Sequence, residues 1–135
     1  MIVVDSSVWI DHFAGRLTAQ VAHLRGVLTD PDQLVVVGDI IMYEVLCGLR
    51  TGRAALEVRE LLSSHLLVTM LGFDLVYRAV ASYRSLRARG VTIKAADVFI
   101  GTYCLETGMP LLTSDKHFTA MRDHLGLRLV VGDPA

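Results

Sequence analysis

The sequence predicts an α/β fold, a three-layer α/β/α sandwich with a central, mostly parallel sheet. Short β-branched runs alternate along the chain with longer segments of helical periodicity. Strands that alternate with helices form a parallel sheet with helices on both faces, joined by right-handed crossovers. None of the short runs alternates apolar with polar residues, which is typical of strands buried on both faces.

Five short apolar runs are the predicted strands, at residues 2–4, 34–37, 66–68, 110–113 and 127–131. The predicted helices between and after them are 18–28, 39–49, 51–62, 73–89, 95–107 and 118–125. Asp39 and Thr51 are suitable N-caps for two of these helices. Glycines stand where three of them should end. The side chains expected to face inward include Val21, Leu24, Leu28, Val58, Leu61, Leu62, Val76, Val80, Tyr83, Ile100, Cys104, Phe118 and Met121.

The composition indicates one ordinary globular domain over residues 1–135. A hydrophobic content of 53% is enough for a real core and excludes disordered, collagenous and disulfide-rich classes. Thirteen basic and fourteen acidic residues leave a net charge of −1, so overall charge points to neither nucleic acid nor membrane. Cys47 and Cys104 lie in apolar runs and are expected to be buried and reduced, as in a cytoplasmic protein.

The mean hydropathy of +0.48 is high for a chain of this kind. The longest stretch without a charged residue, 61–73, is too short to cross a bilayer, so no membrane association is expected. Asp5 and Asp11 interrupt the amino-terminal segment, which therefore does not look like a signal peptide. The apolar surplus is expected to be covered by another chain, which predicts an oligomer.

Four acidic residues occupy positions that call for an explanation. Asp5 and Asp115 each follow a predicted strand, where an aspartate can also simply cap the next helix. Glu44 lies in a nearly all-apolar helix, although it could belong to an exposed stripe. Asp97 shares a helix face with apolar residues, although an acid near a helix N-terminus is favoured in any case. Taken singly, each residue has an ordinary structural explanation.

Together, the four acids predict a cation site. If they converge, two carboxylates ~5 Å apart repel by roughly 3 kcal/mol at an effective dielectric of about 20. They must then take up protons or share a cation. Since no Cys or His is spaced to join them, an all-oxygen site would select Mg²⁺ or Mn²⁺ rather than zinc. A carboxylate-bound Mg²⁺ with open water positions is suited to phosphodiester hydrolysis.

Four motifs in this order resemble the PIN-domain ribonucleases, specifically the VapC-type toxins of bacterial toxin–antitoxin pairs. The opening MIVVDSSVWID looks like the family's first strand, first acid and apolar helix. Glu44 matches its helix glutamate, KAADVFIGT is similar to its third-acid helix, and LLTSDKHF resembles its closing motif. Gly101 stands where alanine is expected, and Ser114 replaces a basic residue often found in the closing turn.

The resemblance implies a PIN-like fold and a metal-dependent endoribonuclease. Its catalytic acids would be Asp5, Glu44, Asp97 and Asp115. Asp5 and Asp97 would be the principal Mg²⁺ ligands, and Asp115 a further one, with Mn²⁺ able to substitute. Glu44 would position or deprotonate the attacking water. Thr113 and Ser6 could hydrogen-bond the ligating carboxylates, unless they are ordinary turn and cap hydroxyls.

RNA contacts are expected from the basic segment between Arg50 and Lys94, which holds eight basic residues and three acids. The candidate RNA-binding residues are Arg84, Arg87, Arg89 and Lys94. The arginines could instead complement a helix dipole in solvent. Among the histidines, only His117 could reach the acids, and an ordinary position on a helix surface is the stronger interpretation for it.

The resemblance also implies two protein partners. One is a small VapB-like antitoxin that covers the acidic groove, often with an arginine directed at the carboxylates. The other is a second copy, giving a homodimer within a larger complex. Trp9, Phe13 and the helix 51–62 are candidate contact surfaces.

A non-enzymatic, Mg²⁺-binding signalling module of receiver type is the main alternative. It would require an acidic pair before the first helix and a phosphorylatable aspartate after a middle strand, where Asp39 fits an N-cap better. A haloacid-type phosphatase would need a second aspartate two residues after Asp5, and that position is serine. A nucleotide-binding module would need a Gly-rich phosphate loop, which is missing from the sequence.

Overall fold

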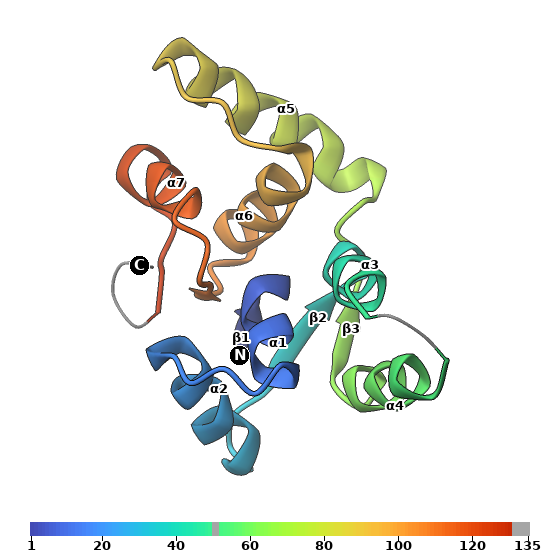
Figure 1. Ribbon diagram of the computed structural model, residues 1–135. Coiled ribbons are helices and arrows are strands. Elements are labelled where there is room, and N and C mark those ends of the chain that lie inside the picture. Colours follow the sequence, from blue (N-terminus) through green and yellow to red (C-terminus); the bar gives the residue numbers. More distant parts are fainter. Residues whose placement is uncertain (50–51, 131–135) are drawn as a thin grey trace.

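The computed structural model describes residues 1–49 and 52–130 and contains a parallel sheet of four strands (Figure 1). The strands are β1 (Ile2–Val4), β2 (Val35–Gly38), β3 (Leu66–Val68) and β4 (Leu111–Leu112), in the order β3-β2-β1-β4. All three pairings are parallel, and Val3 lies opposite Val36 on one side and Leu111 on the other. Strand β2 therefore lies on one side of β1, and β4, which comes much later in the chain, lies on the other side.

Helices cover this sheet in two groups. The described helices are α1 (Ser6–Phe13), α2 (Ala19–Thr29), α3 (Asp39–Cys47), α4 (Gly52–Ser63), α5 (Phe73–Ala88), α6 (Ala95–Thr107) and α7 (Phe118–Leu125). In the first group α1 packs against α2 and α3, and α3 packs against α4. In the second group α5, α6 and α7 pack on one another, as Figure 1 shows. The predicted α/β fold with a parallel central sheet is confirmed. Among the described residues, no helix has both the length and the apolar character needed to cross a membrane.

The central strands are buried as predicted, but β3 is not. All residues of β1 and β2 are buried, and they form the middle of the core with Trp9, Leu24 and Phe118. In β3, Leu66 and Leu67 are 45% and 53% exposed. The prediction of burial on both faces is wrong for β3, an edge strand with a neighbour on one side only. The other edge strand, β4, is buried and has a bridge from Leu111 to Leu129 on its outer side.

Several predicted boundaries move by a residue or more. Strand β2 begins at Val35 rather than at residue 34, and β4 is shorter than the predicted 110–113. The predicted strand 127–131 contributes one bridge, from Leu129 to Leu111, and its last residue lies outside the described part of the chain. The predicted cap Thr51 also lies outside the described residues.

Asp39 was predicted to be an N-cap, and the structure makes Gly38 the cap and Asp39 the first helical residue of α3. Asp39 Oδ1 accepts hydrogen bonds from the backbone N–H of Ile40 (3.0 Å) and of Met70 (2.7 Å). The side chain therefore ties the segment after β3 to the start of α3, which explains an acid at this position without a catalytic role.

The largest difference concerns the inward face of α5. Val80 and Tyr83 were predicted to face inward, yet they are 39% and 45% exposed. The buried residues of this helix are instead Leu75, Ala79 and Leu86. Because α5 carries apolar residues on two neighbouring stripes, periodicity alone does not decide which stripe faces α6. Val76, Val80 and Tyr83 line a shallow apolar pocket beside α6.

Two smaller predictions are corrected as well. In α4, Val58 and Leu62 are buried as expected, whereas Leu61 is 41% exposed. Cys104 is buried, and burial raises the pKa of its thiol to about 12. Cys47, expected to be buried, is exposed at the C-terminal end of α3.

Gly101 departs from the resembled motif for a reason that the packing makes clear. A Cβ atom at this position would lie 2.4 Å from Sδ of Met121. Met121 is fully buried between α7 and α6. The glycine therefore lets α7 approach α6 closely and leaves room for the methionine. Gly108 and Gly126 end their helices with φ angles of 71° and 81°, as predicted.

Candidate metal centre

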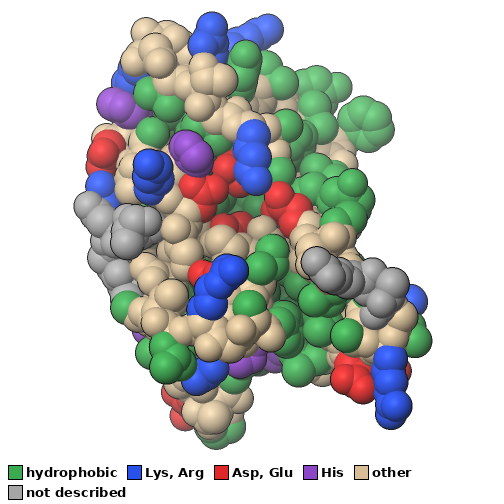
Figure 2. All heavy atoms as spheres, in the orientation of Figure 1, with side chains coloured by type: hydrophobic (Ala, Val, Ile, Leu, Met, Phe, Trp, Pro, Cys, Tyr) green, Lys and Arg blue, Asp and Glu red, His purple; other side chains and the backbone are tan. Residues whose placement is uncertain are grey.

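The four acids predicted from the sequence line one cleft at the carboxyl edge of the sheet. Asp5 directly follows β1, Asp115 follows β4, Glu44 comes from α3, and Asp97 from the first turn of α6. The cleft has a volume of about 400 Å³, and Figure 2 shows acidic side chains gathered in the hollow of this face. It opens beside β1, where the chain crosses to opposite sides of the strand, which is the usual ligand site of an open parallel sheet.

Asp5 is the most deeply placed carboxylate, with 2% of its surface exposed. Its Oδ2 accepts hydrogen bonds from the hydroxyls of Ser7 (2.7 Å) and Thr113 (2.9 Å). Its Oδ1 is buried and has no hydrogen-bond partner. Asp5 occupies the N-cap position of α1 but makes no capping hydrogen bond, so capping does not explain it. Burial raises its pKa, and the hydrogen bonds from Ser7 and Thr113 oppose that effect.

Asp97 is the second buried acid and is also 2% exposed. Burial, followed by the charge of Asp5, raises the pKa of Asp97 to about 7. Lys94 acts in the opposite direction, with its Nζ 3.9 Å from Asp97 Oδ1. The helix N-terminus favours a negative charge, but this does not explain why Asp97 is buried beside another carboxylate, since both burial and that neighbour oppose its ionisation. Without a cation, the cleft therefore tolerates its own charges poorly.

Glu44 and Lys94 form the outer part of the cleft. Glu44 Oε1 accepts a hydrogen bond from Ser6 Oγ (3.0 Å), and Oε2 lies 3.4 Å from Lys94 Nζ. Burial lowers the pKa of Lys94, but the charges of Asp97 and Glu44 outweigh burial, so the pKa lies above its ordinary value. Lys94 was predicted to contact RNA, and in this structure its ammonium group faces two acids.

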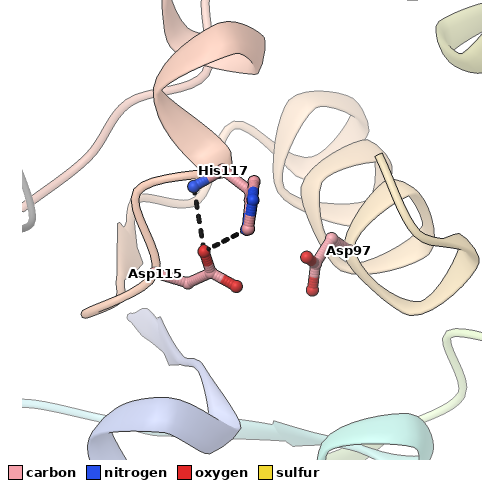
Figure 3. A group of neighbouring side chains, drawn as sticks. All are labelled: Asp97, Asp115 and His117. Atoms are coloured by element: carbon pink, nitrogen blue, oxygen red, sulfur yellow. Dashed lines mark hydrogen bonds and ion pairs between the residues drawn. The ribbon is translucent and has the colours of Figure 1, made fainter. Parts of the chain in front are cut away.

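Asp115 lies at the opposite side of the cleft and is held by its own turn. Its Oδ1 accepts one hydrogen bond from the backbone N–H of His117 (2.9 Å). The same oxygen lies 2.8 Å from the ring nitrogen Nδ1 of His117 (Figure 3). Its backbone N–H donates to Thr113 Oγ1 (3.0 Å). Because Thr113 also donates to Asp5, one buried hydroxyl joins two of the four acids.

Hydroxyl groups organise these carboxylates, and one of them was missed by the sequence reasoning. Of the two hydroxyls named from the sequence, Thr113 donates to Asp5, whereas Ser6 donates to Glu44 rather than to an aspartate. The missed residue is Ser7, which donates to Asp5 and accepts from the backbone N–H of Ser114 (3.0 Å). Its position two residues after the first acid was the only signal in the sequence.

The donor set suits a divalent cation. Among the described residues, ligand atoms of Asp97, Asp115 and His117 lie within 4.8 Å of one another. Asp5 is outside that group but lines the same cleft with an unpartnered oxygen. A buried carboxylate oxygen without a donor is unusual, and a cation would satisfy it. The sequence favoured an ordinary helix-surface position for His117 over one near the acids, whereas the turn after Asp115 brings the imidazole of His117 against that carboxylate.

The three predicted RNA-binding arginines lie elsewhere. Arg84, Arg87 and Arg89 belong to the C-terminal part of α5 and its cap, and none of them lines the cleft. The guanidinium of Arg87 donates to Thr92 Oγ1 (2.6 Å), and that of Arg89 donates to Ser85 Oγ (2.7 Å). Their contact with RNA stays a prediction.

Comparison with known proteins identifies the family. The family model described as PIN domain matches residues 2–123, which is nearly the whole chain. The chain belongs to the PIN-domain family. This PIN domain also superposes on VapBC2 from Rickettsia felis bound to a promoter DNA fragment (TM-score 0.76, 12% identity), with 96% of this chain and 98% of that one covered.

Two further structures are similar to this PIN domain. VapBC-1 from nontypeable Haemophilus influenzae matches with a TM-score of 0.74 and 20% identity, covering 96% of this chain and 97% of that one. A toxin–antitoxin complex from Klebsiella pneumoniae matches with a TM-score of 0.69 and 19% identity, covering 97% of both chains. At these identities the likeness concerns the fold, so the chemistry must be argued from the cleft itself.

Proposed function

We propose that this PIN domain is a metal-dependent endoribonuclease that hydrolyses RNA phosphodiester bonds with Mg²⁺, for which Mn²⁺ can substitute. The observation that carries the proposal is the buried Asp5, whose Oδ1 has no partner in a cleft that also holds Asp97 and Asp115. Burial and mutual repulsion oppose the ionisation of Asp5 and Asp97, and a bound dication would favour their ionised forms. Nuclease chemistry is what a carboxylate-held dication in an open cleft serves best.

Asp5, Asp97 and Asp115 would hold the ion. A bound dication would polarise the phosphoryl group and lower the pKa of a water molecule. Ser7 and Thr113 fix Asp5 by donating to Oδ2, which leaves Oδ1 free to bind. This arrangement preorganises the deepest ligand before any ion arrives.

Glu44 would accept the proton of the attacking water on a carboxylate oxygen. Ser6 holds Oε1 and Lys94 faces Oε2, so the side chain is oriented from both ends. Lys94 is 60% exposed, and its ammonium could turn from the acids to a substrate phosphate as RNA enters. Its position at the cleft makes it the best supported of the four predicted RNA-binding residues.

We also propose that the domain acts as a VapC-type toxin and is inhibited by a small antitoxin. One similar structure is a toxin–antitoxin complex, which supports a protein partner of this kind. A basic residue of that partner could replace the cation's charge in the acidic cleft. A homodimer stays part of the proposal, with a changed contact surface. Trp9 is fully buried and cannot serve as predicted. The predicted helix 51–62 remains a candidate, with Leu56 and Leu61 57% and 41% exposed, and Phe73 and Tyr77 of α5 add side chains that are 82% and 75% exposed.

The receiver-type alternative finds no support in the described residues. Asp39 follows the middle strand β2, but its Oδ1 is occupied by two backbone N–H groups. A phosphorylatable aspartate would have to lie beside the metal-binding acids, and Asp39 lines a different pocket from Asp5, Asp97 and Asp115.

The experiment measures cleavage of single-stranded RNA by the purified chain, freed of any bound protein. Mg²⁺ or Mn²⁺ should support cleavage, EDTA should abolish it, and Asp5→Asn should lower the rate by at least about a hundredfold. Asp32→Asn is the matched control, because this exposed aspartate precedes β2 and lies outside the cleft lining. Cleavage that survives both EDTA and Asp5→Asn would exclude the proposed mechanism.

A further inference from the structure

His117 places an imidazole nitrogen among the acids of the cleft. Its ligand atom and those of Asp97 and Asp115 lie within 4.8 Å of one another, as Figure 3 shows for the three side chains. The side chain is 63% exposed, yet its ring is turned toward Asp115. The histidine comes from the residue just before α7, two residues after Asp115.

The spacing of these atoms is that of ligands around one ion. With metal–ligand distances of about 2.1 Å, two neighbouring ligands of an octahedral ion lie ~3 Å apart and two opposite ligands ~4.2 Å apart. His117 Nδ1 lies 2.8 Å from Asp115 Oδ1, a hydrogen-bond distance, so a dication that displaced the proton between them would find both atoms as far apart as neighbouring ligands. The ligand atom of Asp97 lies within 4.8 Å of both. The unpartnered Oδ1 of Asp5 in the same cleft is an independent sign that a cation belongs there.

We propose that His117 is a nitrogen ligand of the metal centre, together with Asp97 and Asp115, and that it makes the site prefer Mn²⁺ to Mg²⁺. The inference rests on the proposed metal-dependent function and goes beyond it by naming the ligand that sets metal preference. Mg²⁺ is a hard ion that favours oxygen ligands and gives up water reluctantly, whereas transition-metal dications accept imidazole readily. A mixed site thus replaces the all-oxygen site expected from the sequence.

Metal binding to the full, metal-free chain tests the proposal. Calorimetric titration gives the Kd for Mn²⁺ and for Mg²⁺, and pulsed electron paramagnetic resonance of bound Mn²⁺ detects a coordinated nitrogen. The wild-type chain should bind Mn²⁺ at least about tenfold more tightly than Mg²⁺ and show nitrogen modulation. His117→Ala should weaken Mn²⁺ binding by about tenfold or more, remove the modulation, and change the Mg²⁺ Kd by less than about threefold.

His124→Ala is the matched control. His124 is an exposed histidine of α7, the helix that follows His117, and lies outside the three-residue group, so this variant should keep both Kd values and the nitrogen signal. Absence of nitrogen modulation in the wild-type chain would overturn the proposal, whatever the variants do. An equal loss of Mn²⁺ and Mg²⁺ binding in His117→Ala would overturn it too, because that result indicates a positioning role through Asp115.

The binding measurements need no RNA, so the two proposals can fail separately. A chain that binds Mn²⁺ through nitrogen but cleaves no RNA would refute the proposed function and leave His117 as a ligand. A chain that cleaves RNA with Mg²⁺ and Mn²⁺ equally, without a nitrogen signal, would retain the function and refute the role of His117.

Discussion

Replacing Asp97 by asparagine should make the metal-free protein more stable while removing its metal-dependent activity. Burial and the charge of Asp5 raise the pKa of Asp97 from 3.8 to about 7. The folded state therefore binds this proton more tightly than the unfolded state does. Stability is highest when Asp97 is protonated, and it falls as the pH rises from about 4 to about 7. Asparagine has nearly the same shape and carries no charge, so it removes this pH dependence.

The size of the effect follows from the pKa. Raising it from 3.8 to about 7 lowers the free energy of unfolding by about 4 kcal/mol above pH 7, since a tenfold change in proton affinity is worth about 1.4 kcal/mol. At pH 5 the loss is only about 2 kcal/mol. Between pH 5 and pH 8 the wild-type chain should thus lose about 2 to 3 kcal/mol relative to Asp97→Asn. Any constant effect of the asparagine amide cancels in this comparison.

Urea unfolding in EDTA at pH 5 and pH 8 measures the difference. Asp32→Asn serves as the control, because its carboxylate is exposed and it should follow the wild-type chain. Added Mn²⁺ should stabilise the wild-type chain at pH 8 and have much less effect on Asp97→Asn. Equal changes in unfolding free energy between pH 5 and pH 8 for the wild-type chain and Asp97→Asn would refute this account of the cleft.

Two further substitutions test the support of the site and the packing behind it. Thr113→Val keeps the side-chain shape but leaves Asp5 Oδ2 with one donor fewer and the Asp115 N–H without its acceptor. This variant should lower the free energy of unfolding in urea by about 1–3 kcal/mol and weaken metal binding. Thr113→Ser should keep most of the stability and most of the metal affinity. If Thr113→Val changed neither quantity, the proposed role of the hydroxyl would be contradicted. Gly101→Ala brings a Cβ within 2.4 Å of Met121 Sδ and should cost about 1–3 kcal/mol by overpacking. Adding Met121→Ala to Gly101→Ala should relieve that clash. If Gly101→Ala alone were as stable as the wild-type chain, Met121 would have moved aside and the packing argument would be wrong.

The fold was largely predictable because apolar periodicity reports burial directly. The burial of the central strands and of one face of α6 follows from the spacing of their apolar residues, because these side chains are removed from water only when that face packs against the core. The face of α5 was not predictable, because two apolar stripes compete and contact with α6 buries Leu75 and Ala79 rather than Val80. The exposure of β3 was also out of reach, since strand order decides which strand lies at the edge.

The sequence by itself singled out the four acids and placed Asp5 and Asp115 at one edge of the sheet, because parallel strands bring the residues after them to one side. The structure brought Glu44 and Asp97 to the same cleft from two helices. Only the tertiary structure decided how those acids are held: which oxygen of Asp5 keeps no partner, that Ser7 supports it, and that His117 turns toward Asp115. The contacts of Ser7 and His117 depend on side-chain directions, and the hydrogen bond from Thr113 to Asp5 depends on contact between segments 108 residues apart. A linear pattern of residue types records neither.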